Sequence, residues 1–318
     1  MGDGNDAHTV SRMRHLSCST ALAVSIASIC LQAQVASDPS PHQVRIVTVD
    51  SSVRLEVLDW GGTGRPLLFV GCYLSAHVYD DIAPKLRDQF HVYAITRRGI
   101  APSDQPPAGY DPQRRADDVM DVIDQLGMQK PILVGNACGG HILHTLGAQH
   151  TDRIGGLVYA DAAEDPTLKL SDYDFPPADR VNLAAFRGKP TPVTFPPAER
   201  RRIEVHPIDP AIRKALTEDH LVRPDYAAIK VPVLAIYRST TLERALKDFP
   251  PTTDREREAV ELAVTARRTV LTKWQNDLRG GVPGARIVEL PSANLYMFLS
   301  RESDVIREIR SFSATLAP

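Results

Sequence analysis

Cysteine is scarce in this chain of 318 residues, and its copies are far apart. The four cysteines are Cys18, Cys30, Cys72 and Cys138, a spacing that fits neither a zinc ribbon nor a disulfide-rich scaffold. No charge of one sign prevails, because 37 lysine and arginine residues are balanced by 39 aspartate and glutamate residues. We therefore expect no nucleic acid and no anionic membrane surface as a partner, and the pattern indicates no metal site.

Internal repeats and low-complexity tracts are absent as well. Hydrophobic residues make up 43% and charged residues 24% of the chain, which are ordinary values for a globular protein with a sizeable core. At roughly 150 residues per domain, the length allows about two domains or one large domain with an insertion. No cofactor-binding motif is evident, so we expect a small-molecule ligand and no cofactor.

One long hydrophobic run is present, near the N-terminus. Residues 16–31 carry no charge, follow a basic segment that begins at Met13, and precede the small residues of 32–37. This pattern is typical of a secretory signal peptide, and the run is shorter than the ~20 residues that span a bilayer. We predict that residues 1–37 are an extension plus signal peptide, with Met13 as a possible true start, and that the protein is secreted or periplasmic. A membrane-anchored N-terminus and a buried helix are the alternatives.

Beyond the leader, short apolar segments alternate with amphipathic ones. Because such alternation with short connections produces a parallel sheet covered by helices on both faces, we expect an α/β fold. Expected strands cover residues 42–50, 52–59, 66–71, 91–96, 131–135, 154–160, 231–237 and 285–290, and expected helices cover 78–88, 112–126, 139–150, 254–278 and 300–316. The first two strands read as an antiparallel pair.

The alternation stops between residues 164 and 229. This segment contains ten prolines and no long apolar strand, so we interpret it as a cap inserted into the sheet domain. The sheet domain itself is then expected to comprise residues 38–163 and 230–318.

A strand-to-helix turn is the strongest motif. Residues 135–139 read Gly-Asn-Ala-Cys-Gly, which resembles the nucleophile elbow G-x-S-x-G of the α/β-hydrolases. Further resemblances to this family are found in the expected order at 69–72 (the oxyanion loop), 98–104 (R-G-x-G-x-S-D), 149–159 (H-P-D-R-V-x-x-L-V-L) and 291–295 (G-x-x-H). They resemble small-molecule ester and epoxide hydrolases and imply an α/β-hydrolase fold with an eight-stranded, mostly parallel sheet and a cap.

The catalytic residues of the family do not carry over. Ala137 stands at the nucleophile position and Leu295 at the histidine position, and the last histidine of the chain is His220. After the seventh strand no carboxylate precedes Glu243, so Asp161, after the sixth strand, is the best candidate for the acid. The family needs its histidine after the final strand. We therefore predict that no triad is intact.

The resemblance also implies an oxyanion hole and a pocket. Gly71, Cys72 and Cys138 stand at or beside the family's oxyanion positions, and His77 lies just beyond the first of them. We favour Cys138 as a packed or oxyanion-hole residue, with a shifted nucleophile or a disulfide to Cys72 as alternatives. His77 is a candidate pocket residue, although a place at a helix start is the simpler reading.

Other polar residues near the motif have simpler explanations. His141 and His144 are spread around their helix with Cys138, which does not focus three ligands on a metal. Arg98 is expected to position the loop that follows it, and Ser103 and Asp104 to cap a turn within that loop.

Two functions follow from this pattern. The first is a degenerate hydrolase that binds a small, mostly apolar molecule between sheet and cap and lacks serine-hydrolase activity. The second is an active hydrolase of small esters or epoxides that works through Asp161, Cys138 or a bound water. A third explanation of the pattern is that residues 137 and 295 were altered deliberately or by sequence error. The oligomeric state and the ligand's identity stay open.

Overall fold

The computed structural model describes residues 40–173, 207–217 and 221–317. The predicted signal peptide and the middle of the predicted cap lie outside these residues. Within the described ranges, no helix combines the length and the apolar character that a membrane span requires.

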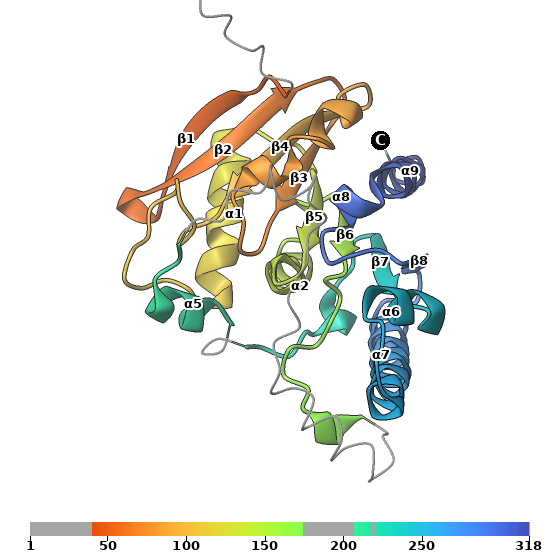
Figure 1. The fold of residues 1–318 in the computed structure, drawn as a ribbon. Helices are drawn as coiled ribbons and strands as arrows, with labels where there is room; N and C mark the ends of the chain where they lie inside the picture. The colour runs from red at the N-terminus through yellow and green to blue at the C-terminus, as the bar shows by residue number, and fades with distance from the viewer. Residues whose placement is uncertain (1–39, 174–206, 218–220, 318) are drawn as a thin grey trace, which may run out of the picture. The chain divides into compact units, whose positions relative to one another are not determined.

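An eight-stranded sheet organises the described residues (Figure 1). Its order is β1-β2-β4-β3-β5-β6-β7-β8; β1 pairs with β2 and β2 with β4 in antiparallel fashion, and the other neighbours are parallel. The strands are β1 (Gln43–Val49), β2 (Val53–Gly61), β3 (Arg65–Val70), β4 (Phe90–Thr96), β5 (Ile132–Asn136), β6 (Gly156–Ala160), β7 (Val233–Ser239) and β8 (Arg286–Pro291). All eight expected strands are therefore present, and the α/β-hydrolase fold class is confirmed.

Helices pack on both faces of this sheet (Figure 1). The α-helices in the described ranges are α1 (Pro112–Gln125), α2 (Gly139–Gln149), α5 (Pro210–Thr217), α6 (Leu242–Asp248), α7 (Asp254–Gly281), α8 (Met297–Ser300) and α9 (Glu302–Ser313). Short 3₁₀ turns are η1 (Asp50–Ser52), η2 (Ala76–Tyr79), η3 (Ala83–Leu86), η4 (Leu170–Asp172) and η5 (Tyr226–Ala228). Helix α7 begins with a capping box, in which Thr253 and Glu256 satisfy each other's backbone N–H groups.

Alternating side chains of the central strands divide the core into two layers. In β3, Leu68 and Val70 pack with residues of α1, α2 and α7, whereas Leu67 and Phe69 pack with residues of η2, α8 and α9. This alternation follows from the two-residue period of a strand, and it explains why the strand is apolar throughout.

The prediction of one helix is wrong. The segment predicted as a helix over residues 78–88 forms the two short turns η2 and η3. Pro84 stands at the start of η3 and has no N–H to donate to the preceding turn, so a continuous helix through this point loses a hydrogen bond and meets a steric clash. The helix expected at 254–278 continues to Gly281, and the last helix begins at Glu302.

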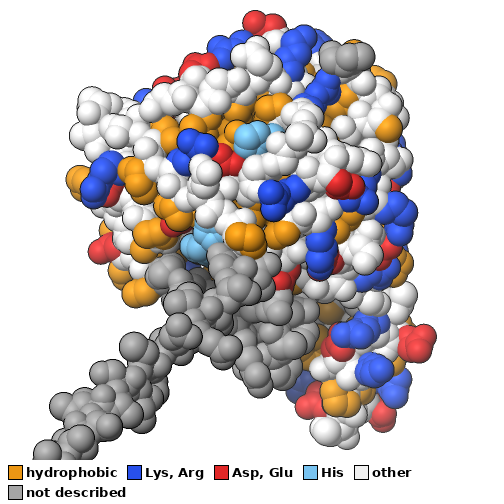
Figure 2. Space-filling model, turned by 90° about the horizontal axis from the view of Figure 1, so that it is seen from above, with side chains coloured by type: hydrophobic (Ala, Val, Ile, Leu, Met, Phe, Trp, Pro, Cys, Tyr) orange, Lys and Arg blue, Asp and Glu red, His pale blue; other side chains and the backbone are white. Residues whose placement is uncertain are grey.

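The surface carries a mixture of side chains. On the face drawn in Figure 2, basic, acidic and apolar side chains are interspersed, in keeping with the small net charge of -2.

Candidate active site

A strained turn joins β5 to α2. Strand β5 ends at Asn136, helix α2 begins at Gly139, and between them Ala137 has a φ of 47°, in the left-handed region. The N–H of Gly140 donates to the Ala137 carbonyl at 2.9 Å and closes the turn. Such a conformation costs about 1–3 kcal/mol for a residue other than glycine, and it persists where the surroundings impose it.

Close backbone contacts impose this turn. A Cβ atom at Gly139 would lie 2.2 Å from the Val70 carbonyl oxygen, and one at Gly140 would lie 2.0 Å from the Ala162 carbonyl oxygen. A Cβ atom at Gly135 would lie 2.9 Å from a Leu143 methyl group. The glycines are therefore needed for close packing of the turn between β3 and the end of β6.

The buried side chain of Asn136 ties three parts of the candidate site together. Its Nδ2 donates to the Ala160 carbonyl at 2.8 Å and to the Leu295 carbonyl at 2.9 Å. Ala160 precedes Asp161 and Asn136 precedes Ala137, so the predicted nucleophile, acid and histidine positions meet at the carboxyl edge of the sheet. The sequence motif did not indicate this role for Asn136.

Asp161 is held by two arginines. Its carboxylate accepts from Nε of Arg238 at 2.5 Å and from Nη2 of Arg267 at 3.1 Å, and its side chain is 4% exposed. Burial lowers the pKa of Arg267, and the neighbouring Asp161 opposes that effect. The residue therefore has the position expected for it, but its charge is balanced and its oxygens are engaged.

Cys72 and Cys138 form a disulfide, with their Cα atoms 5.1 Å apart. The bond joins the residue after Gly71 to the residue after Ala137, so the two predicted oxyanion positions are adjacent. Of the alternatives for Cys138, the structure has the disulfide. No thiolate is available at this residue while the bond is intact.

The histidines near the turn have partners of their own. His77 contacts Asp80 through Nδ1 at 3.0 Å and lies 3.9 Å from a carboxylate oxygen of Glu56; its place in a pocket stays a prediction. His144 lies 3.2 Å from the Tyr159 hydroxyl, and burial lowers its pKa to about 3. His144 is therefore neutral at pH 7 and is enclosed in the core.

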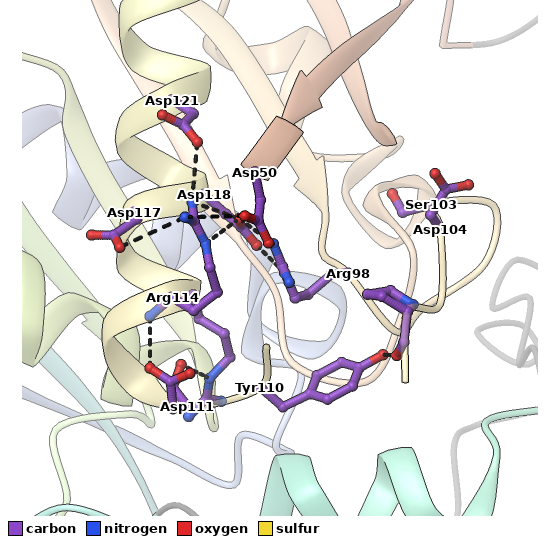
Figure 3. A network of polar contacts seen from close by, with 12 residues as sticks. Asp50, Arg98, Ser103, Asp104, Tyr110, Asp111, Arg114, Asp117, Asp118 and Asp121 are labelled. Atoms are coloured by element: carbon purple, nitrogen blue, oxygen red, sulfur yellow. Dashed lines mark hydrogen bonds and ion pairs between the residues drawn. The ribbon is translucent and has the colours of Figure 1, made fainter. Parts of the chain in front are cut away.

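Arg98 belongs to a network of charges between β4 and α1 (Figure 3). Its Nη2 donates to Asp118 at 2.7 Å and lies 3.5 Å from Asp50. Ser103, in the loop that follows, accepts from the Glu56 N–H at 2.9 Å. The charge of Arg98 is thus balanced by carboxylates outside the loop, and its role in positioning the loop stays a prediction.

The contacts of the preceding residue, Arg97, differ from those of Arg98. It is 4% exposed, its Nη2 donates to the Cys72 carbonyl, and the same atom lies 3.4 Å from Sγ of Cys138. Its Nε and Nη1 have no hydrogen-bond partner among the described residues. The sequence offered no signal for this difference beyond two consecutive arginines at a strand end.

A comparison of the sequence with models of protein families agrees with the fold described above. The model of the family described as "Alpha/beta hydrolase family" matches residues 61–308. The chain belongs to the alpha/beta hydrolase family.

Curated relatives of this family member match over part of the chain. A soluble epoxide hydrolase of Corynebacterium sp. (strain C12) is 27% identical over 40% of this chain and 45% of its own length. A 2-(acetamidomethylene)succinate hydrolase of Mesorhizobium japonicum is 29% identical over 41% of this chain and 46% of its own length. Haloalkane dehalogenase 2 of Mycobacterium tuberculosis is 30% identical over 47% of this chain and 49% of its own length. The chain thus spans about half the length of these relatives.

Solved structures support the same fold over a longer stretch. The bromoperoxidase from Bacillus anthracis aligns with a TM-score of 0.63 at 16% identity, covering 86% of this chain and 100% of that one. The structure of E-2-(acetamidomethylene)succinate hydrolase aligns with a TM-score of 0.58 at 21% identity, again over 86% and 100%. At these identities the likeness concerns the fold alone.

Proposed function

We propose that this member of the alpha/beta hydrolase family binds a small, mostly apolar molecule at the carboxyl edge of the sheet and does not act as a serine hydrolase. One observation carries the proposal: the strained turn of the elbow is retained, but the residue at its tip is Ala137. The methyl group of alanine cannot attack a carbonyl. Asn136 holds the backbone of Leu295 beside this turn, where the family's histidine is expected.

The expected loss of rate is large. Removal of the nucleophile or the base from a triad lowers the rate about 10⁶-fold, and removal of the second adds little. Binding and an oxyanion hole leave a residual acceleration of about 10³–10⁴ over water. On this proposal the chain keeps the family's binding site with its acyl-transfer chemistry removed.

The alternative is an active hydrolase of small esters or epoxides, as the names of the relatives suggest. Two of its three routes have little support, because Asp161 is paired with Arg238 and Arg267, and Cys138 is in a disulfide. A bound water is the remaining route.

We also propose that the protein is exported. The signal-like segment at residues 1–37 is one support. The disulfide is the other, since such bonds form and persist in oxidising compartments.

Turnover of a short-chain ester panel tests the proposed function. The full chain, with its disulfide intact, is compared with Ala137→Ser/Leu295→His and with Ala137→Ser alone as a matched control. We expect turnover by the natural protein and by the single variant to stay at the residual level, and turnover by the double variant to be about 10²-fold or more above both, the usual contribution of a general base. Turnover by the natural protein at a rate comparable to the double variant would overturn the proposal.

A further inference from the structure

Two arginines, Arg97 beside the elbow and Arg115 on α1, are buried without a carboxylate partner among the described residues. Arg97 is 4% and Arg115 is 3% exposed, and neither forms an ion pair with a described residue. Nε and Nη1 of Arg97 and Nη1 of Arg115 have no hydrogen-bond partner in that part of the chain. Among the described residues, Nε of Arg115 donates to the Asp111 carbonyl at 3.4 Å.

These two guanidinium groups oppose each other electrostatically. Burial lowers the pKa of Arg97 to about 9, with the charge of Arg115 as the second cause. Burial also lowers the pKa of Arg115, and Asp111 and Tyr73 oppose that effect. Arg97 is still protonated at pH 7. Two like charges in a dry site cost free energy unless an anion balances them.

The contacts of Arg97 place this side chain at the candidate active site. Arg97 contacts both halves of the disulfide, at Cys72 and Cys138. The phenol of Tyr73, which follows Cys72, has its pKa raised by burial and lowered by the charges of Arg97, Arg213 and Arg115. The charges of these arginines therefore act on the phenol of Tyr73, which stands directly after a predicted oxyanion residue.

Apolar side chains adjoin the same spot. Tyr73 packs against a buried cluster made of Ile100, Tyr110, Ile208, Ile212 and Leu216, of which the last two belong to α5. Helix α5 lies within the predicted cap. The region between the strand end and the cap thus combines a cationic group with an apolar wall.

We propose that Arg97 and Arg115 form a subsite for the carboxylate of a small ligand whose apolar body lies against Tyr73 and the α5 cluster. The proposal rests on the proposed function and deepens it, because it assigns the bound molecule to the apolar carboxylic acids or their conjugates. Guanidinium groups match carboxylates in geometry and donate two parallel hydrogen bonds to them.

A purely structural role explains less of the arrangement. The bond from Arg97 to the Cys72 carbonyl uses one nitrogen and stabilises one loop. It does not account for the other two nitrogens of Arg97 or for the second buried cation, Arg115. A side chain retained for that bond alone would also be expected to have a carboxylate partner, as its neighbour Arg98 does.

Matched neutral and charged probes test the subsite. Binding of hexanoate and hexanamide, and of benzoate and benzamide, is measured by calorimetry on the full oxidised chain. For the natural protein we expect each carboxylate to bind at least about 10-fold more tightly than its amide, as loss of a charged hydrogen bond implies. In Arg97→Met this preference should vanish, whereas Arg257→Gln, an exposed change on α7, should retain it.

Stability separates a ligand-binding arginine from a structural one. Without ligand, Arg97→Met should unfold at a temperature no lower than the natural protein, because removal of an unbalanced buried charge offsets the lost bond to the Cys72 carbonyl. A clearly lower unfolding temperature together with an unchanged carboxylate preference would overturn the subsite. If Arg97→Met does not fold, Arg115→Met and the probe pairs on the natural protein provide the same test.

The outcomes distinguish the two proposals. If the carboxylate and the amide bind equally, the proposed binding function stands and the carboxylate subsite is wrong. If no probe of either kind binds, the proposed binding of small apolar molecules fails, and the subsite fails with it.

Discussion

Arg97 and Arg98 are consecutive and almost equally buried, at 4% and 1% exposure, yet their surroundings are opposite. Arg98 lies in a network with Asp118 and Asp50, in which its charge is balanced (Figure 3). Arg97 has a backbone carbonyl and a disulfide sulfur as neighbours. The contrast separates a cation that is part of the framework from one whose hydrogen-bonding capacity is largely unused.

The alternation of side chains along a strand explains how Arg97 and Arg98 reach different surroundings. Arg97 and Arg98 follow the end of β4, where consecutive side chains point to opposite sides. Arg98 donates to Asp118 on α1, whereas Arg97 contacts the Cys72 carbonyl and Sγ of Cys138 beside the turn between β5 and α2. The two consecutive arginines thus contact different parts of the structure.

Loss of the partner of Arg98 should have the largest effect. Asp118→Ala removes the nearer carboxylate of the buried Arg98 and leaves it the longer, 3.5 Å contact to Asp50, so the free energy of unfolding is expected to fall by about 3–5 kcal/mol. Urea denaturation measures this change. Asp117→Ala is the matched control, because Asp117 is on the same helix and is 40% exposed in a long ion pair of 3.8 Å. Equal effects of the two variants would remove the distinction between the two sides of the loop.

Loss of the disulfide beside Arg97 should have the next largest effect. Cys72→Ser/Cys138→Ser releases a closed loop between residues 66 positions apart, and the free energy of unfolding is expected to fall by about 2–4 kcal/mol. Thermal unfolding of the natural protein with and without a reductant provides an independent measurement. An unchanged midpoint after complete reduction, verified by counting free thiols, would contradict this expectation.

Loss of the exposed ion pair between Arg54 and Asp104 should have the smallest effect on stability. Arg54 contacts Asp104 at 3.0 Å and is 67% exposed, and exposed pairs contribute little. Arg54→Gln is therefore expected to leave the urea midpoint within experimental error. Its backbone N–H still donates to Asp104 at 2.8 Å, so a clear loss of stability in this variant would mean that the side-chain pair stabilises the loop.

Much of the fold could be predicted from local sequence. The strands and their succession along the chain, the mostly parallel character of the sheet and the elbow followed from apolar segments, glycine spacing and motif order. Gly135, Gly139 and Gly140 are examples, since their small size is visible in the sequence and the close contacts of the turn require it. The error over residues 78–88 also had a local cause, because the effect of Pro84 outweighed the helical spacing of its neighbours.

Tertiary structure decided which charges are balanced and which polar groups meet. The sequence by itself determined that Ala137 and Leu295 replace the reactive residue types of the family motifs, and that Cys72 and Cys138 stand at its oxyanion positions. Only the fold showed that the two cysteines are bonded and that Asn136 links the elbow to the loop after β8. The physical reason is distance along the chain: these partners are 66 and 159 residues apart, and no local pattern encodes such a pairing.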